Sequence, residues 1–184
     1  MRALATAALF LVAGTAAIAG TAAAQNIPDI KPGDTCQKLR ATYGAESSQE
    51  GPAHVWKQGT LTIQVLVRPG GPCVAGSVNF MVAPGRTVTT RDGIVLGKDT
   101  IAAAGLKLKG RIDNTSYVFD LGGGKSFGQI VVPPIASFPF KSTYSWQLNP
   151  ARTGKLSAPP TLADFTSESA TFYTLDPPDP QGMQ

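Results

Sequence analysis

The run Gly124-Lys125-Ser126-Phe127-Gly128 matches the G-x-S-x-G pattern that exposes the nucleophile of many serine hydrolases. Such a serine lies on a turn between a strand and a helix, and its histidine base comes later in the chain. Here residues 129–132 are rich in β-branched side chains and run into two prolines, which predicts a strand, and the only histidine, His54, precedes the serine. We therefore expect a glycine-rich turn between two strands at residues 122–124. A hydrolase using Ser126 is kept only as a third hypothesis on function.

Two other chemical interpretations of these residues are weaker. Gly124, Lys125 and Ser126 are similar to the end of a phosphate-binding loop, but the glycine required five positions earlier is replaced by Phe119. Histidine suits proton transfer near neutral pH, yet a lone histidine beside an aromatic residue is more often packed or exposed without a chemical role. The sequence therefore predicts no catalytic residue, no enzymatic activity and no cofactor.

Cys36 and Cys73 are the only cysteines of the chain. In an oxidising compartment an isolated pair usually forms a disulfide, and closing a loop of about 37 residues would stabilise the fold by roughly 3 to 4 kcal/mol. The alternative is a metal pair or a reactive thiol. Because the chain has one histidine, a zinc site would need carboxylates to complete it. We therefore expect a disulfide and no metal.

Aromatic residues recur at even intervals in the last third of the chain: Phe138, Phe140, Tyr144 and Trp146. This spacing predicts a strand with the aromatic side chains on one face. They would then fill the core side of a sheet, which is the interpretation we favour. Alternatively they form an exposed patch that holds a partner or a ligand.

The first 24 residues have the three parts of a cleavable secretory signal: a charge at Arg2, an apolar stretch, and small residues ending at Ala24. The mature chain is expected to begin at Gln25, or about five residues earlier. The apolar stretch is short and interrupted by glycines, no basic cluster follows it, and no cysteine near the cut offers a lipid site. We therefore expect a soluble protein of the periplasm or the extracellular medium, with no membrane anchor.

The mature chain would keep about 160 residues, with 15 basic and 12 acidic side chains. This length suits one ordinary domain or two small units that share a core. The basic residues are spread along the chain and form no cluster, so nucleic acid is not an expected partner.

Two stretches about 64 residues apart share one pattern. In the first, Gly33, Asp34 and Thr35 lead into a short amphipathic helix that ends at Gly44, with Asp34 expected as its cap. In the second, Gly97 and Thr100 lead into an alanine-rich helix. Alternating apolar residues predict strands after each helix. The predicted strands are 60–67 and 73–82, as a hairpin, in the first stretch, 116–121 and 129–132 in the second, and further strands near 138–148 and 171–175. The shared pattern suggests an internal duplication.

These elements predict an α+β fold, an antiparallel β-sheet with short helices packed on one face. The expected divisions are a helix and hairpin unit at 25–84, a second β-rich unit at 85–175 and a disordered tail at 176–184.

The glycine, capping residue, short helix, tryptophan and alternating strand of the first stretch resemble the small periplasmic module of the lipoprotein subunit of the outer-membrane β-barrel assembly machinery. In tandem, the pattern resembles the β-lactamase-inhibitory proteins. The resemblance implies a sheet that binds partners through its surface, without catalysis. The leading hypothesis is therefore an exported protein that binds another protein or an envelope component. The alternative is a carrier of a small apolar or lipidic ligand.

Overall fold

The computed structural model describes residues 25–83, 85–112, 114–120, 125–148 and 170–178. The predicted signal peptide, the predicted glycine turn at 122–124 and most of the predicted tail lie outside these ranges. Within them the predicted α+β class is confirmed, because two short helices accompany sheets whose strands pair almost entirely antiparallel.

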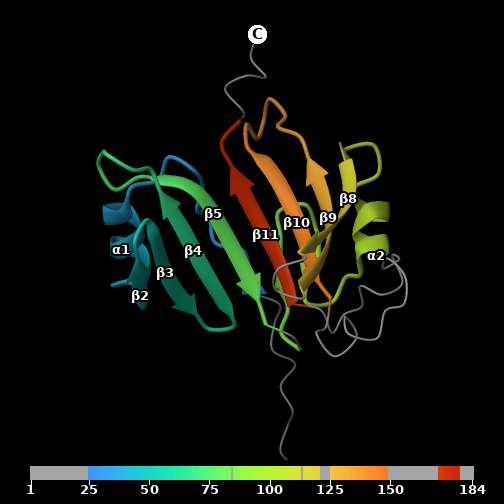
Figure 1. Cartoon of the computed structure of the whole chain (residues 1–184), viewed down its shortest axis with the longest axis horizontal. Coiled ribbons are helices and arrows are strands. Elements are labelled where there is room, and N and C mark those ends of the chain that lie inside the picture. The colour runs from blue at the N-terminus through green and yellow to red at the C-terminus, as the bar shows by residue number, and fades with distance from the viewer. Residues whose placement is uncertain (1–24, 84, 113, 121–124, 149–169, 179–184) are drawn as a thin grey trace, which may run out of the picture.

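The elements follow one another in an order that repeats (Figure 1). The helices are α1 (Cys36–Tyr43) and α2 (Ile101–Lys107). The strands are β1 (Gln25–Asn26), β2 (Ser48–Glu50), β3 (Ala53–Gln58), β4 (Leu61–Val67), β5 (Ala75–Val82), β6 (Val88–Thr89), β7 (Val95–Leu96), β8 (Asn114–Asp120), β9 (Lys125–Val132), β10 (Lys141–Gln147) and β11 (Ala170–Asp176).

Eight of the strands form one large sheet in the order β2-β3-β4-β5-β11-β10-β9-β8. Each helix is therefore followed by four strands that run as a meander from one edge of the sheet to its centre. The two meanders meet where β5 pairs antiparallel with β11. Strands β1, β6 and β7 form a second, small sheet. The predicted hairpin is confirmed as β4 and β5, whereas the short strands β1, β2, β6 and β7 were not predicted.

Both helices begin with a threonine cap. The hydroxyl of Thr35 accepts from the backbone N–H of Lys38, and the hydroxyl of Thr100 accepts from the N–H of Ala103, each at 3.2 Å. The prediction that Asp34 is the cap was therefore wrong by one residue. The side chain of Asp34 is engaged elsewhere, because it accepts from the backbone of Lys31 and the ammonium of Lys38.

Asp99, before α2, has the same kind of partners as Asp34. Its carboxylate accepts from the backbone N–H of Val95 at 2.7 Å and from the ammonium of Lys107 at 2.6 Å. The glycine that precedes each aspartate has positive φ, 96° at Gly33 and 78° at Gly97. The two halves thus repeat a helix start and a meander, as the sequence pattern suggested.

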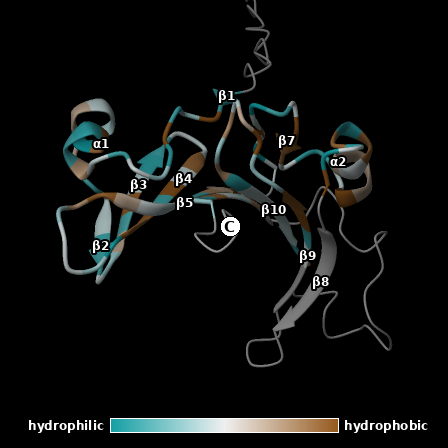
Figure 2. Cartoon of the chain, turned by 90° about the horizontal axis from the view of Figure 1, so that it is seen from above, coloured by the Kyte–Doolittle hydropathy of each residue, from teal (hydrophilic) through white to brown (hydrophobic). Residues whose placement is uncertain are grey.

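One face of the large sheet is covered by the other elements of the described chain. Figure 2 shows the sheet bent into an arch, with α1, α2 and the small sheet on its outer side. Alternate residues of β3, β4, β5, β9, β10 and β11 point to this side and form one continuous core across both halves. The division into units at residue 84 stays a prediction, since buried residues of both halves pack together.

Tryptophans from the two halves tie this face to the helices. Trp56 of β3 donates from its indole N–H to the carbonyl of Gly44 at the end of α1, at 3.0 Å. Trp146 of β10 donates to the carbonyl of Asp99, just before α2, at 2.8 Å. Each indole is about 1 % exposed, so its apolar rings fill the core while its single polar group is paired.

Gly97 offers a stability test with a matched control. Gly97→Ala is expected to destabilise the protein by about 1 to 2 kcal/mol for its positive φ and by about 1 to 3 kcal/mol more for a steric conflict. A Cβ at this position would lie 1.8 Å from the carbonyl oxygen of Arg86, whereas at Gly93, with φ of 75°, it would meet nothing within 4 Å. Denaturant unfolding of both variants measures the difference, and equal losses for Gly97→Ala and Gly93→Ala would contradict the steric argument.

Candidate functional site

Ser126 and His54 are too far apart to act together. Ser126 lies on β9 and His54 on β3, and these strands are five positions apart in the sheet. At about 4.8 Å for each strand spacing the separation is roughly 24 Å. Ser126 is also the second residue of a strand that pairs with β8, with no helix after it. The geometry therefore removes the serine hydrolase hypothesis that pairs these two residues.

The predicted disulfide is present. Cys36 is the first residue of α1, Cys73 lies just before β5, and their Cα atoms are 5.4 Å apart. The backbone N–H of Cys36 also donates to the carbonyl of Cys73 at 2.9 Å. The bridge thus joins α1 to the β4–β5 hairpin, as expected from the sequence.

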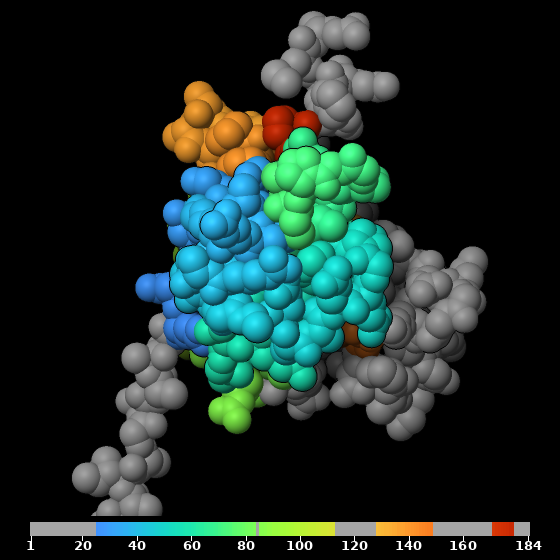
Figure 3. All heavy atoms as spheres, turned by 90° about the vertical axis from the view of Figure 1, so that its left-hand side faces the viewer, coloured from blue at the N-terminus to red at the C-terminus, as the bar shows by residue number. Residues whose placement is uncertain are grey.

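His54 lies directly beside the disulfide, a contact that the sequence did not reveal. Its Nε2 is 3.8 Å from Sγ of Cys73, and its Nδ1 is 2.9 Å from a carboxylate oxygen of Glu46. The imidazole is 4 % exposed. Figure 3 faces this end of the molecule, where the first half of the chain, coloured from blue to green, packs into a continuous surface. His54 is therefore a packed residue with two defined neighbours.

Glu46 is held by Arg40 on its other side. The guanidinium donates from Nε and Nη2 to both carboxylate oxygens, at 2.7 to 2.9 Å. These hydrogen bonds, with a smaller contribution from His54, lower the pKa of Glu46 from 4.5 to about 2, against the opposing effect of burial.

This shift predicts an acid-dependent loss of stability. Because the pKa of Glu46 is lower in the folded protein, its contribution is complete above pH 4.5 and disappears as the pH falls to about 2. The free energy of unfolding should therefore fall less over this range in Glu46→Gln than in the unmodified protein. The exposed carboxylate of Glu50 gives the control, since Glu50→Gln should leave the slope unchanged. Parallel pH profiles for the Glu46 variant and the parent would contradict the prediction.

The four aromatic residues do not form one surface. Tyr144 and Trp146 are at most 1 % exposed and belong to the core, so the core interpretation applies to them. Phe138 and Phe140 precede β10, pack edge to face with centroids 5.1 Å apart, and are only partly buried. An exposed patch of all four is therefore incorrect, because β10 turns every second side chain toward the helices.

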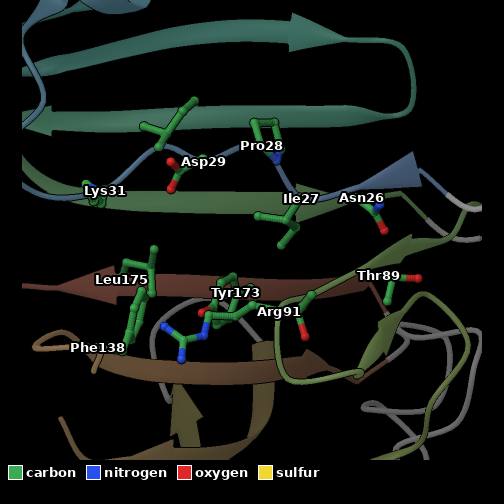
Figure 4. A pocket seen from close by; sticks show the side chains of 12 residues that line it. Asn26, Ile27, Pro28, Asp29, Lys31, Thr89, Arg91, Phe138, Tyr173 and Leu175 are labelled. Atoms are coloured by element: carbon green, nitrogen blue, oxygen red, sulfur yellow. The ribbon is translucent and has the colours of Figure 1, made fainter. Parts of the chain in front are cut away.

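Phe138 lines a cavity of about 380 Å³ on the outer side of the sheet. Figure 4 shows this cavity between the segment that precedes α1, residues 26–31, and the strand β11. Tyr173 and Leu175 of β11 and residues 89–91 complete the lining. The volume falls within the usual range of small-molecule sites, about 300 to 1,000 Å³.

Charged groups stand at the walls of this cavity. The guanidinium of Arg91 lies 3.4 Å from the ring centroid of Phe138, and its Nε is 3.6 Å from Asp92. Asp92 in turn accepts from Arg111 at 2.9 Å and from the hydroxyl of Tyr144 at 2.5 Å. Burial and the neighbouring acidic groups raise the pKa of the Tyr144 phenol, which therefore stays protonated as a donor. This network fixes Arg91 against the wall.

The inner, concave face of the sheet carries polar and small apolar side chains in rows. One row crosses six strands in register, and its members are all half-buried: Val55, Gln64, Asn79, Thr174, Thr143 and Val131. Leu66 and Met81 also point to this face and are 42 % and 38 % exposed. Figure 2 places no helix and no other described strand on this side. The concave face is therefore open as far as the described chain goes.

Within the residues that the structure describes, these observations define an α+β protein with a curved antiparallel sheet, one covered face and one open face. The chain shows no significant similarity to any protein-family model, curated protein or solved structure with which it was compared. Neither α1 nor α2, the helices of the described residues, is long and apolar enough to be a membrane-spanning segment.

Proposed function

We propose that the protein is an exported, non-enzymatic binding protein whose concave sheet face holds another protein. The observation that carries this proposal is the difference between the two faces of the large sheet, since the described helices and the small sheet cover only the outer one. The inner side presents half-buried and exposed side chains that a partner could contact. The resemblance seen in the sequence implies the same arrangement and the same mode of binding.

The dimensions of the concave face favour a protein over a small molecule. Eight strands at about 4.8 Å spacing give a width of about 38 Å. With about 20 Å presented along each of the longer strands and about 10 Å along β2, the face covers about 720 Å², close to the roughly 800 Å² that each partner contributes to a standard interface.

The chemistry of the face also suits a protein surface. Amide and hydroxyl side chains such as Gln64, Asn79 and Thr143 can donate and accept hydrogen bonds, and Leu66 and Met81 add apolar contacts. A rigid sheet presents these groups without a large loss of backbone entropy on binding. Small and polar residues of this kind make selective contacts rather than a general hydrophobic patch.

Site-specific crosslinking tests the proposal. A photoreactive residue at Asn79, on the concave face, should capture a reproducible protein from the native compartment, whereas one at Leu106, exposed on α2, should not. With that partner purified, Asn79→Arg should weaken binding by at least about tenfold and Leu106→Arg should not. Equal capture at both positions, or capture at neither, would count against the concave face as the binding surface.

The cavity beside Arg91 supports a second candidate function, the transport of a small amphipathic ligand. Its walls combine apolar side chains, such as Ile27 and Leu175, with the cations Lys31 and Arg91 and the single carboxylate of Asp29, which leaves one positive charge in excess. This combination fits an apolar body that carries one anionic group, such as a medium-chain carboxylate.

Calorimetric titration separates the two functions. A series of straight-chain carboxylates should bind, matched neutral alcohols should bind more weakly, and Lys31→Gln should remove the preference for the carboxylate. Lys57→Gln, on the concave face, is the matched control. Equal affinity for acids and alcohols would contradict a role for Lys31, and absence of binding by both series would remove the carrier function.

A further inference from the structure

Three metal-ligating side chains converge beneath α1: Cys36, His54 and Cys73. Their donor atoms all lie within 4.8 Å of one another. Cys36 and His54 are 1 % and 4 % exposed, while Cys73 is half-buried and gives solvent a route to the cluster. In the structure the two sulfurs are joined as a disulfide and so cannot act as thiolate ligands.

The contact between His54 and the disulfide leaves one ring nitrogen without a hydrogen-bond donor. A carboxylate only accepts hydrogen bonds, so Nδ1 carries the proton that is donated to Glu46 at 2.9 Å. In the neutral imidazole Nε2 then has a lone pair, and this lone pair faces Sγ of Cys73 at 3.8 Å. A disulfide sulfur has no proton to give. A buried acceptor is thus aimed at two sulfurs that cannot satisfy it.

Protein metal sites commonly use a histidine held in this way. A ligating imidazole typically donates its second N–H to a carboxylate, which fixes the tautomer and the ring orientation. Here Glu46 has that position, and Arg40 holds Glu46 through both carboxylate oxygens. The imidazole is therefore fixed with its lone pair toward the cysteines before any metal binds.

We propose that the dithiol form of the protein binds one Zn²⁺ through Cys36, Cys73 and Nε2 of His54, so that disulfide and metal are alternative states of one site. The fourth position is taken by water on the accessible side, next to Cys73. Zn–S and Zn–N bonds of about 2.3 and 2.0 Å place neighbouring donor atoms about 3.5 to 3.8 Å apart. The N–S value is the shorter of these, about 3.5 Å, and the present Nε2–Sγ distance of 3.8 Å is only slightly longer.

The conversion between the two states balances as an ordinary thiol–disulfide exchange. An external dithiol supplies two electrons and two protons, becomes a disulfide itself, and leaves two thiols on Cys36 and Cys73. Binding of Zn²⁺ then releases these two thiol protons, while His54 coordinates as the neutral imidazole. A newly made chain whose cysteines have not been oxidised can bind the metal directly.

The sequence predicted no metal because two cysteines and one histidine leave a four-coordinate zinc site one ligand short, a position that water fills in the proposed site. His54 and Cys73 are 19 residues apart in the chain, and the pairing of β3 with β4 and of β4 with β5 brings them together. The site thus depends on the fold and not on a ligand motif.

Cobalt substitution tests the site in the full mature chain. After reduction, Co²⁺ should bind with one ion per chain and give thiolate charge-transfer and tetrahedral d–d bands, and Zn²⁺ should displace it. His54→Gln should lose the tetrahedral spectrum. Glu46→Gln should bind about 10- to 100-fold more weakly than Glu50→Gln. The oxidised protein should give no such bands.

Circular dichroism shows whether the reduced protein is still folded. If reduction loosens the fold, addition of Zn²⁺ should restore the native spectrum in the parent and in Glu50→Gln. Three results would overturn the proposal: an unchanged cobalt spectrum in His54→Gln, equal affinities of the Glu46 and Glu50 variants, or a stoichiometry of two chains per ion.

Discussion

Trp146→Ala is expected to lower the free energy of unfolding by about 4 kcal/mol. The indole is 1 % exposed and lies in register between Gly128 of β9 and Thr171 of β11. Gly128 has no side chain, so the residue directly opposite on that strand cannot fill the space left by the ring. The variant also leaves the carbonyl of Asp99 without its side-chain donor.

Two control variants separate the causes of this loss of stability, and urea unfolding measures each of them. Trp146→Phe keeps most of the apolar volume and removes the N–H, so it should cost about 1 to 2 kcal/mol. Leu106→Ala, at a side chain that is 77 % exposed, should cost little. A loss below about 1 kcal/mol for Trp146→Ala would mean that α2 is not held to the sheet at this point.

Loss of the disulfide is the second large effect. Cys36→Ala with Cys73→Ala is expected to destabilise the protein by about 4 kcal/mol, because the sequence separation of the bridged residues is 37 and the open chain regains the corresponding loop entropy. The cost includes the separation of α1 from the hairpin, where Cys36 is buried.

Unfolding in the presence and absence of a reductant checks this value. The parent should lose about the same stability on reduction as the double variant loses by substitution, and the double variant should not respond to the reductant. A chelator is needed in every sample, because metal bound to the dithiol would restore part of the stability. A double variant as stable as the oxidised parent would show that the bridge does not stabilise the protein by constraining the unfolded chain.

The sequence predicted the local structure well because its signals are local. Gly44, with φ of 80°, ends α1 where a glycine was expected to end it, and the alternation of Leu61, Ile63 and Val65 marks β4 on its buried side. For the helix end and the strand, neighbouring residues carry all the information that is needed. The disulfide followed from the number of cysteines and the expected oxidising compartment.

The candidate sites could not be predicted in the same way, because they join segments that are distant in the chain. The contact of His54 with Cys73 and the cavity between residues 26–31 and β11 both arise from tertiary packing. The even spacing that runs from Phe138 to Trp146 continues through the point where β10 begins at Lys141. Spacing alone could not show that the pairs on either side of that point have different environments.

The pairing of β5 with β11 has a consequence for how the chain reaches this structure. The centre of the sheet joins residues near 80 to residues near 173, so the closing contact has high contact order and must wait for nearly the whole chain. Until then the first meander presents the full length of β5 as an unpaired edge. Such an edge recruits other strands, so a chain that folds slowly or is cut short would be open to pairing with a second copy. Protection of β5 until β11 has paired with it is therefore a requirement of correct folding.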